Sequence, residues 1–222
     1  MNSKTRSEPL LFSIIALSLL SVGLLLLLGL ETLRGRQTAR HTPTFSPEGF
    51  NKILRAARHT RYQKDAPYKV VEFADFECPA CRASFDAMNV PGQASPAVTL
   101  AFFHVPGEGH HTAFPAAVAA EAAGRQGKFW EMYSLLFATE DTITEQYLLS
   151  CGRGIGLDIK RFRKDYKDPA LSALVRQDKR LAEQIGITRT PTFLVQNRRG
   201  EIRWLEGHDE LAEYLNAARG QD

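Results

Sequence analysis

Apolar residues in this chain form one long run near the N-terminus, several short runs of strand length, and segments with helical spacing. Residues 70–76 are almost all apolar, which is typical of a strand buried on both faces of a sheet. Directly afterwards Cys81, Phe85 and Met88 recur at the spacing of one helix face. The change of period predicts a strand that leads at once into a helix.

A second strand run, residues 98–105, follows a loop that contains proline and glycine. Strand, helix and strand in close succession predict a βαβ unit with a right-handed crossover. Residues 107–185 then have helical periodicity. Residues 192–195 and 201–205 have the pattern of an antiparallel hairpin, followed by a final helix that Asp209 can cap. The pattern as a whole predicts an α/β domain with an α-helical insertion.

The longest apolar run, Leu10 to Leu30, contains no charged residue. At about 1.5 Å per residue it is long enough to cross a bilayer core of about 30 Å, so we expect one N-terminal transmembrane helix. A cleavable signal peptide is the alternative, but its apolar region usually has about 7–15 residues and ends in small residues. The basic residues that flank the run on both sides do not decide its orientation.

These patterns predict five segments. Residues 1–8 form an N-terminal cytoplasmic tail, residues 9–30 a transmembrane anchor, and residues 31–65 a polar tether with a possible short helix after Ser46. The sheet domain comprises residues 66–106 and 186–222, and residues 107–185 form an inserted helical subdomain.

Composition agrees with one well-packed domain. The chain has 222 residues, of which 44% are apolar and 24% charged, so it can bury a sizeable core. Its net charge of +3 is small, and basic residues mostly alternate with acidic ones. No basic patch with interleaved aromatic residues is present in the sequence, so we expect no nucleic-acid partner.

The candidate chemistry lies in Cys78-Pro79-Ala80-Cys81, where the predicted strand meets the predicted helix. Pro79 suits the first helical position, which places Cys78 at the helix N-terminus. Free backbone N–H groups and the helix dipole there favour a thiolate, by roughly up to 1.5 pKa units. We therefore predict that Cys78 is a nucleophile and that Cys81, on the packed side, is a resolving thiol. The charge of Glu77 would oppose this shift.

Two other interpretations of the cysteine pair remain open at this stage. A zinc site usually needs four ligands, but only Cys151 is left, and His110 and His111 are adjacent to each other. No metal is therefore predicted. A purely structural disulfide across so short a loop would add little stability. Cys151 itself fits a small buried apolar residue on a helix face, with a regulatory or intermolecular thiol as the alternative.

Glu72 is unusual because it interrupts the apolar strand run. A buried charge is expensive and usually shifts its pKa, so the position needs an explanation. Glu72 could lie at a strand end or edge and reach water. Alternatively, it could exchange a proton with Cys81 as a disulfide opens and closes.

Residues 72–81 resemble the active-site segment of the DsbA-like thioredoxin-fold family of thiol:disulfide oxidoreductases. Residues 119–130, which end in Gln-Gly-Lys-Phe-Trp, resemble the inserted helical part of the same family. The resemblance implies that Glu72 is the buried acid, Cys78 the attacking cysteine and Cys81 the resolving one. Thr190-Pro191 is similar to the family's cis-proline loop, although unaided statistics favour a trans bond. This loop, with Pro79 and Ala80, would then contact the substrate.

Together, the apolar run, the redox pair and the resemblance predict a membrane-tethered oxidoreductase that exchanges disulfides with exported proteins on the periplasmic side of the inner membrane. It would need no cofactor, and a membrane redox partner would recycle its dithiol. Strong oxidants of the family often have His where this chain has Ala80, so we expect a mild oxidase. The alternatives are a reductase or isomerase fed by a membrane electron donor, or a non-catalytic tethered module that binds peptides as a chaperone.

Overall fold

The computed structural model describes residues 43–88 and 98–219. The predicted cytoplasmic tail and transmembrane anchor lie outside these residues, as does the first part of the tether. Among the helices that are described, none has both the length and the apolar character needed to span a bilayer. From Pro43 onward the chain forms one compact unit.

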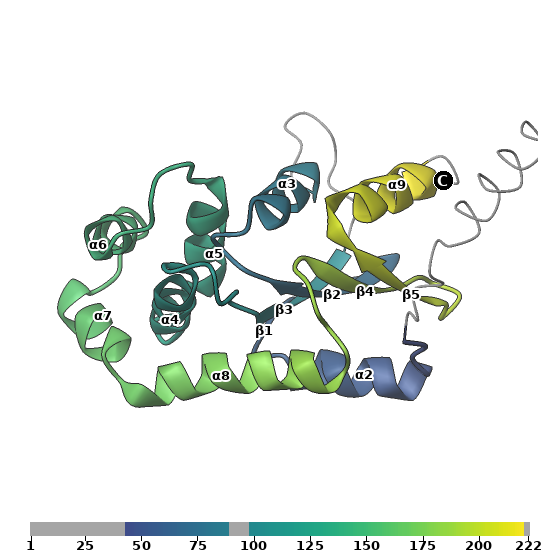
Figure 1. Ribbon diagram of the computed structural model, residues 1–222, viewed down its shortest axis with the longest axis horizontal. Helices are drawn as coiled ribbons and strands as arrows, with labels where there is room; N and C mark the ends of the chain where they lie inside the picture. Colours follow the sequence, from purple (N-terminus) through teal and green to yellow (C-terminus); the bar gives the residue numbers. More distant parts are fainter. Residues whose placement is uncertain (1–42, 89–97, 220–222) are drawn as a thin grey trace, which may run out of the picture. The chain divides into compact units, whose positions relative to one another are not determined.

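The unit is built on a five-stranded sheet in the order β1-β3-β2-β4-β5 (Figure 1). The strands are β1 (His59–Arg61), β2 (Tyr68–Ala74), β3 (Val98–His104), β4 (Thr192–Gln196) and β5 (Ile202–Glu206). Strands β2 and β3 are parallel, whereas the other neighbouring pairs are antiparallel. Because β2 pairs on both edges and is covered on both faces, its sequence is almost continuously apolar.

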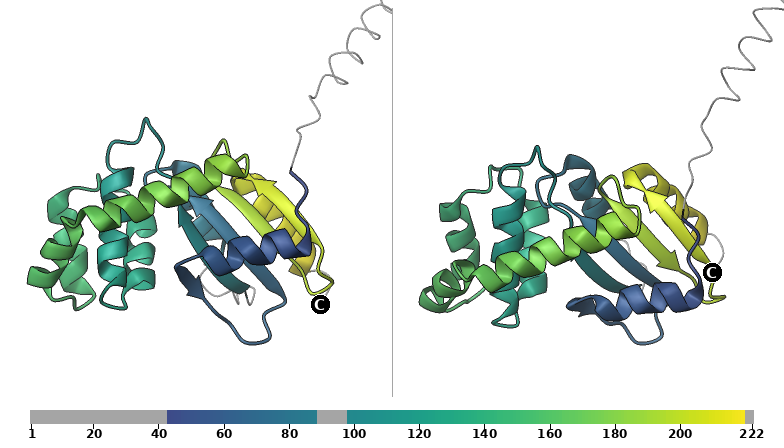
Figure 2. Two further views of the ribbon diagram at one scale, coloured as in Figure 1. Left: turned by 90° about the horizontal axis from the view of Figure 1, so that it is seen from below. Right: turned by 60° about the horizontal axis from the view of Figure 1, so that its bottom comes forward.

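Helices cover both faces of the sheet (Figures 1 and 2). Helices α3 (Pro79–Met88) and α9 (Gly207–Arg219) lie over one face, while α2 (Pro47–Ala56) and the C-terminal part of α8 (Pro169–Gln184) lie over the other. Side chains of β2 alternate between the two layers: Val71 and Phe73 pack towards α2, and Ala74 packs in the layer of α3.

The segment between β3 and β4 is helical, as predicted. It contains α4 (Ala113–Gly124), α5 (Phe129–Ala138), α6 (Glu145–Gly154), α7 (Ile159–Tyr166) and α8. Helix α5 brings a group of aromatic rings against α3, with Phe85 stacked on Phe137 at 5.6 Å between ring centroids. The predicted α/β class with a helical insertion is therefore confirmed.

Residues 47–61, within the expected tether, form a helix and a strand of the folded unit. The short helix is present as α2, and the Ser46 hydroxyl caps it by accepting a hydrogen bond from the Gly49 N–H at 3.1 Å. However, α2 buries Phe50 and Ile53 against the sheet, and β1 adds an edge strand next to β3. This part of the chain is folded onto the domain because an amphipathic helix covers an otherwise open sheet face.

Candidate active site

The Cys-X-X-Cys segment lies where β2 gives way to α3. After β2 ends at Ala74, a short turn is closed by a hydrogen bond of 3.1 Å from the Cys78 N–H to the Asp75 carbonyl. Helix α3 begins at Pro79, and the Cys78 carbonyl accepts the N–H groups of Cys81 and Arg82. Cys78 therefore lies at the helix N-terminus, as the sequence predicts.

The two thiols of this segment have unequal environments. Cys78 keeps 8% of its surface exposed and Cys81 none, and both are reduced. A hydrogen bond from the Cys81 thiol, supported by the Cys81 N–H and opposed by burial, lowers the pKa of Cys78 to about 5. Burial raises the pKa of Cys81 well above its ordinary value. At neutral pH the pair thus holds one thiolate and one thiol.

The third cysteine does not belong to this pair. Cys151 lies in α6 with 7% of its surface exposed, and burial raises the pKa of its thiol. It packs in the same apolar core as Leu148 and Leu157. These surroundings agree with the prediction that Cys151 is a small buried residue among apolar neighbours.

The loop before β4 faces Cys78. The Thr190-Pro191 peptide bond is cis, and the Thr190 carbonyl oxygen lies 3.5 Å from the Cys78 sulfur. The Pro191 carbonyl accepts the Gly207 N–H at 2.8 Å, so the fold itself uses that oxygen. Pro79 is exposed and Ala80 is partly buried. Of the four residues expected to contact a substrate, Thr190 therefore has its backbone carbonyl next to the Cys78 sulfur.

Glu72 lies in the centre of the sheet with no exposed surface. It pairs with Phe102 on β3 and Phe193 on β4, so the alternative of an edge position does not hold. Its side chain projects to the same face of β2 as Ala74, into the layer that contains Cys81. Burial raises the pKa of Glu72 to about 7, against the hydrogen bond from Tyr133.

Tyr133 on α5 is a partner that the sequence analysis missed. Its hydroxyl donates a hydrogen bond of 2.8 Å to Glu72 Oε2, whereas Oε1 has no hydrogen-bond partner among the described residues. From the sequence alone, the apolar surroundings of Tyr133 in α5 indicate only a core aromatic residue. No local signal links it to Glu72, because 61 positions separate the two residues.

Two further acidic residues, Asp75 and Glu77, lie in the turn between β2 and α3. Asp75 is buried, and its Oδ1 accepts the Glu77 N–H at 2.8 Å, while its Oδ2 accepts the Gly107 N–H at 2.7 Å and lies 2.6 Å from His110 Nδ1. Glu77 Oε2 accepts both the N–H and the hydroxyl of Thr112, at 2.7 and 2.8 Å. The charge of Glu77 is thus held at the beginning of α4 and is partly neutralised by these donors.

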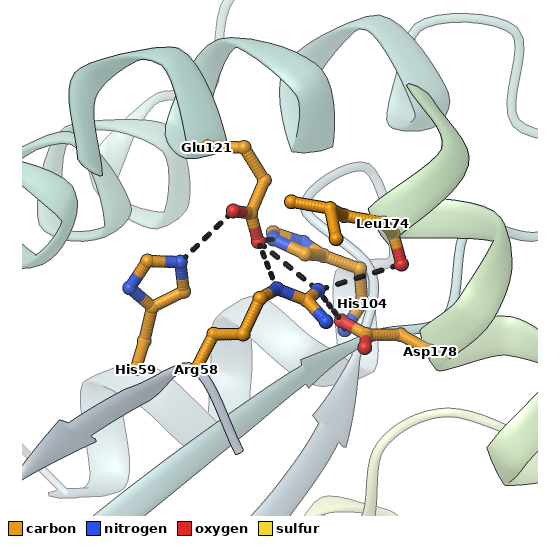
Figure 3. Close-up of polar contacts among 6 residues, drawn as sticks. All are labelled: Arg58, His59, His104, Glu121, Leu174 and Asp178. Carbon is orange, nitrogen blue, oxygen red and sulfur yellow. Dashed lines mark hydrogen bonds and ion pairs between the residues drawn. The ribbon is translucent and has the colours of Figure 1, made fainter. Parts of the chain in front are cut away.

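A second buried polar group, which we call the Arg58 cluster, comprises Arg58, His59, His104, Glu121 and Asp178 (Figure 3). Arg58 contacts Asp178 Oδ2 at 2.6 Å and Glu121 Oε1 at 3.2 Å. Glu121 also lies 3.1 Å from His59 and 3.2 Å from His104. Burial opposes ionisation of Glu121, but the hydrogen bonds from the two imidazoles outweigh it and hold its pKa far below the ordinary value.

The residue types of the Arg58 cluster would suit a metal ion. One candidate ligand atom each from His104, Glu121 and Asp178 lies within 4.8 Å of the others. However, the Arg58 guanidinium bonds both carboxylates and so already supplies the positive charge between them. The cluster has the geometry of a buried ion-pair network.

Comparison with known proteins agrees with this architecture. A sequence profile of the family described as Thioredoxin matches residues 55–217. A thioredoxin-like oxidoreductase from Silicibacter pomeroyi DSS-3 is 28% identical, with 73% of this chain and 91% of that chain covered and a TM-score of 0.60. Pseudomonas aeruginosa DsbA2 is 26% identical, with 75% and 95% covered and a TM-score of 0.55.

Curated relatives of higher identity carry a different name. Na(+)/H(+) antiporter NhaA 3 of Salinispora tropica is 39% identical over 142 residues, and NhaA 1 of Salinispora arenicola is 38% identical over 152 residues. Each match covers 64% of this chain but only 22% of the relative. Most of each relative therefore lies outside the match.

Proposed function

This chain belongs to the thioredoxin family, and from that premise we propose that it is a DsbA-like protein thiol:disulfide oxidoreductase with Cys78 and Cys81 as its redox pair. The observation that carries the proposal is the unequal placement of the two cysteines: Cys78 lies at the N-terminus of α3 beside the Thr190 carbonyl, whereas Cys81 is fully buried. With a pKa of about 5, Cys78 is a thiolate at neutral pH, while Cys81 beside it stays protonated. A thiolate is the form that attacks disulfides and the better leaving group when a disulfide opens.

In the oxidising direction, a client thiolate attacks the Cys78 sulfur of the Cys78–Cys81 disulfide. The S–S bond breaks, Cys81 leaves as a thiolate and then takes up a proton, and a mixed disulfide joins Cys78 to the client. A second client thiolate attacks the client sulfur of this bond and releases Cys78 as a thiolate. Two electrons pass from the client dithiol to the enzyme, and reduction of a client runs the same steps backwards.

Glu72 is proposed as the group that exchanges this proton with Cys81. Its carboxyl has a pKa of about 7, so it is present in both protonation states near neutral pH. It projects into the layer of Cys81, and Tyr133 holds one of its oxygens. The proton would pass directly or through a water molecule.

Client proteins would bind beside Cys78 at Thr190, Pro191, Pro79 and Ala80. The Thr190 carbonyl already contacts the Cys78 sulfur, so an extended client segment placed along this loop would present its own sulfur to Cys78. Pro79 is exposed and offers an apolar contact next to the sulfur.

Net oxidation of clients, at moderate strength, is the direction we propose. Thioredoxin, a reductant, has a Cys pKa of about 7 and the strong oxidant DsbA one of about 3.5. The value of about 5 for Cys78 lies between them. A reductase or isomerase fed by a membrane electron donor is the alternative direction of the same chemistry.

We place the oxidoreductase domain on the periplasmic side of the inner membrane, held by residues 9–30, with exported proteins as clients. The charge-free apolar run supports the anchor, and disulfides persist outside the cytosol. A membrane redox partner would recycle the dithiol, and no cofactor takes part in the proposed steps.

Oxidation of a reduced client protein and reduction of insulin test the proposed activity. Trapping of mixed disulfides tests which cysteine attacks and which one resolves. Cys81→Ser should accumulate covalent complexes with clients, because the attacking Cys78 can no longer be released by its neighbour. Cys78→Ser is the matched control and should trap none. Trapping by Cys78→Ser alone would reverse the roles. Absence of turnover in both directions would favour a tethered binding module instead.

A further inference from the structure

His110 lies in the loop between β3 and α4, where its imidazole contacts the carboxylate of Asp75. The imidazole Nδ1 is 2.6 Å from Asp75 Oδ2, and 34% of the His110 side chain is exposed. The Asp75 carboxylate is itself held by the N–H groups of Glu77 and Gly107. The imidazole is thus anchored to a buried, doubly hydrogen-bonded carboxylate rather than to a mobile side chain.

The backbone of Asp75 belongs to the redox turn. Its carbonyl accepts the Cys78 N–H at 3.1 Å, and its N–H points at the Cys81 sulfur at 3.5 Å. The residue that orients His110 therefore also positions both cysteines. His110 has a defined place relative to the reacting sulfurs although it is remote from them in sequence.

Three acidic groups act on His110: the Asp75 carboxylate by direct contact, and the Glu77 carboxylate and the Cys78 thiolate through their charges. The hydrogen bond with Asp75 raises the pKa of His110, and the charges of all three groups raise it further, although burial opposes the shift. Electrostatic coupling between two sites is reciprocal. An imidazolium that the Cys78 thiolate favours must favour that thiolate equally.

The position of this imidazole matters because Ala80 leaves the Cys-X-X-Cys segment without a cation. Without a charge on His110, the thiolate would lie near two carboxylates with no positive group among these four side chains. Opposite charges favour each other's ionised forms, and the partial exposure of His110 reduces the effect.

We propose that His110, held by Asp75, is a positioning residue that places a positive charge beside the Cys78 thiolate and thereby stabilises the reduced enzyme. The inference rests on the proposed function and adds a residue that contributes to the redox poise of that site. The β3–α4 loop thus supplies the positive charge that Pro79 and Ala80, between the two cysteines, do not supply in this chain.

Three variants of the full chain test the proposal. His110→Gln keeps a hydrogen-bond donor for Asp75 but removes the charge, whereas His110→Lys keeps a charge. His111→Gln is the matched control, because His111 is the exposed neighbour of His110. The readouts are the pKa of Cys78, from the ultraviolet absorbance of its thiolate against pH, and the equilibrium constant with glutathione.

For His110→Gln we expect the pKa of Cys78 to rise by roughly half a unit, and the equilibrium constant for oxidation of glutathione to fall about threefold. His110→Lys should recover most of both changes, and His111→Gln should show neither. Equal shifts in the Gln and Lys variants would overturn the inference, as would an unchanged Cys78 pKa in His110→Gln. Both outcomes leave the proposed function standing, since that fails only if the unmodified enzyme does not turn over.

Discussion

At the scale of single residues, Glu72 is the position where ionisation and folding are most directly linked. Its pKa is raised from 4.5 to about 7 by burial, so between these pH values the folded chain keeps a proton that the unfolded chain has lost. The contribution of Glu72 to stability therefore falls as pH rises through this window, whereas the lowered pKa of Cys78 makes the contribution of that thiolate rise. Above pH 7 the ionised carboxylate lowers the free energy of unfolding by about 3 kcal/mol.

Glu72→Gln should remove that dependence. The amide oxygen can still accept the hydrogen bond from Tyr133, but no charge forms in the sheet. We expect the free energy of unfolding of the reduced variant to exceed that of the reduced unmodified protein by about 3 kcal/mol at pH 8 and by less than about 1 kcal/mol at pH 5, because Cys78 contributes the same pH dependence to both proteins. Urea titrations at a series of pH values measure this. An unaltered pH dependence would show that another group titrates.

The same variant should slow disulfide exchange near neutral pH, because the departing Cys81 thiolate loses the group that supplies its proton. Stopped-flow rates with a reduced client, compared with the stability data above, separate this effect from unfolding. Rates equal to those of the unmodified enzyme across the pH range would leave Glu72 with a structural role alone.

The residues that sequence patterns identified in this site are those whose chemistry is local. Cys78, Cys81 and Glu72 lie within ten consecutive positions, and the helix N-terminus that lowers the pKa of Cys78 follows from Pro79. Tyr133 and His110 escaped because their partners lie 61 and 35 positions away. The shift at Cys78 is also larger than a helix end alone provides, since the Cys81 thiol donates a hydrogen bond.

At the scale of elements, α2 shows what an amphipathic pattern leaves open. The spacing of Phe50, Ile53 and Leu54 predicts a helix with one apolar face, which α2 has. Whether that face packs on the domain depends on which face of the sheet lacks cover, and this is a property of the assembled fold. In the structure α8 covers one part of this face of the sheet, and α2 covers another part beside it (Figure 2).

The Arg58 cluster joins four separate elements, so its loss should affect stability strongly. Arg58→Met would leave the carboxylates of Glu121 and Asp178 buried without their guanidinium partner. Breaking one side of a buried ion pair typically lowers the free energy of unfolding by about 3–5 kcal/mol. Chemical denaturation measures the loss.

Arg55→Met is the matched control, because Arg55 lies on the exposed side of α2. Exposed substitutions of this kind usually change stability by no more than about 0.5 kcal/mol. Equal losses in the Arg58 and Arg55 variants would mean that the cluster contributes no more than an exposed charge.

At the scale of the whole molecule, periodicity was sufficient for the class of fold and the order of its elements. The buried strand before the cysteines, the helical insertion and the final hairpin each have a distinct spacing of apolar residues. The order of the strands in the sheet could not be predicted in this way. Strand β1 has only three residues, and it pairs with β3, which lies far along the chain. The position of Thr190-Pro191 beside Cys78 likewise followed from family resemblance and not from spacing.

The redox poise is a property of the whole folded chain, since it compares the stability of its reduced and oxidised forms. A Cys78 pKa of about 5 stabilises the reduced form less than in the strongest oxidants of the family. We therefore expect a potential between about −270 mV, the value for thioredoxin, and about −120 mV, the value for DsbA. Equilibration with glutathione buffers measures it. A potential as high as that of DsbA would contradict a mild oxidase.

The similar exposure of Cys78 and Cys151 has a practical consequence. The two side chains expose 8% and 7% of their surface, so access alone would not distinguish them towards a small alkylating reagent. Their proton affinities do, because the pKa of Cys78 is lowered to about 5 and that of Cys151 is raised. In mildly acidic buffer the native reduced protein should therefore take up one equivalent of iodoacetamide rapidly, at Cys78. Peptide mapping by mass spectrometry would count the label, and rapid carbamidomethylation of Cys151 would show that ionisation does not govern its reactivity.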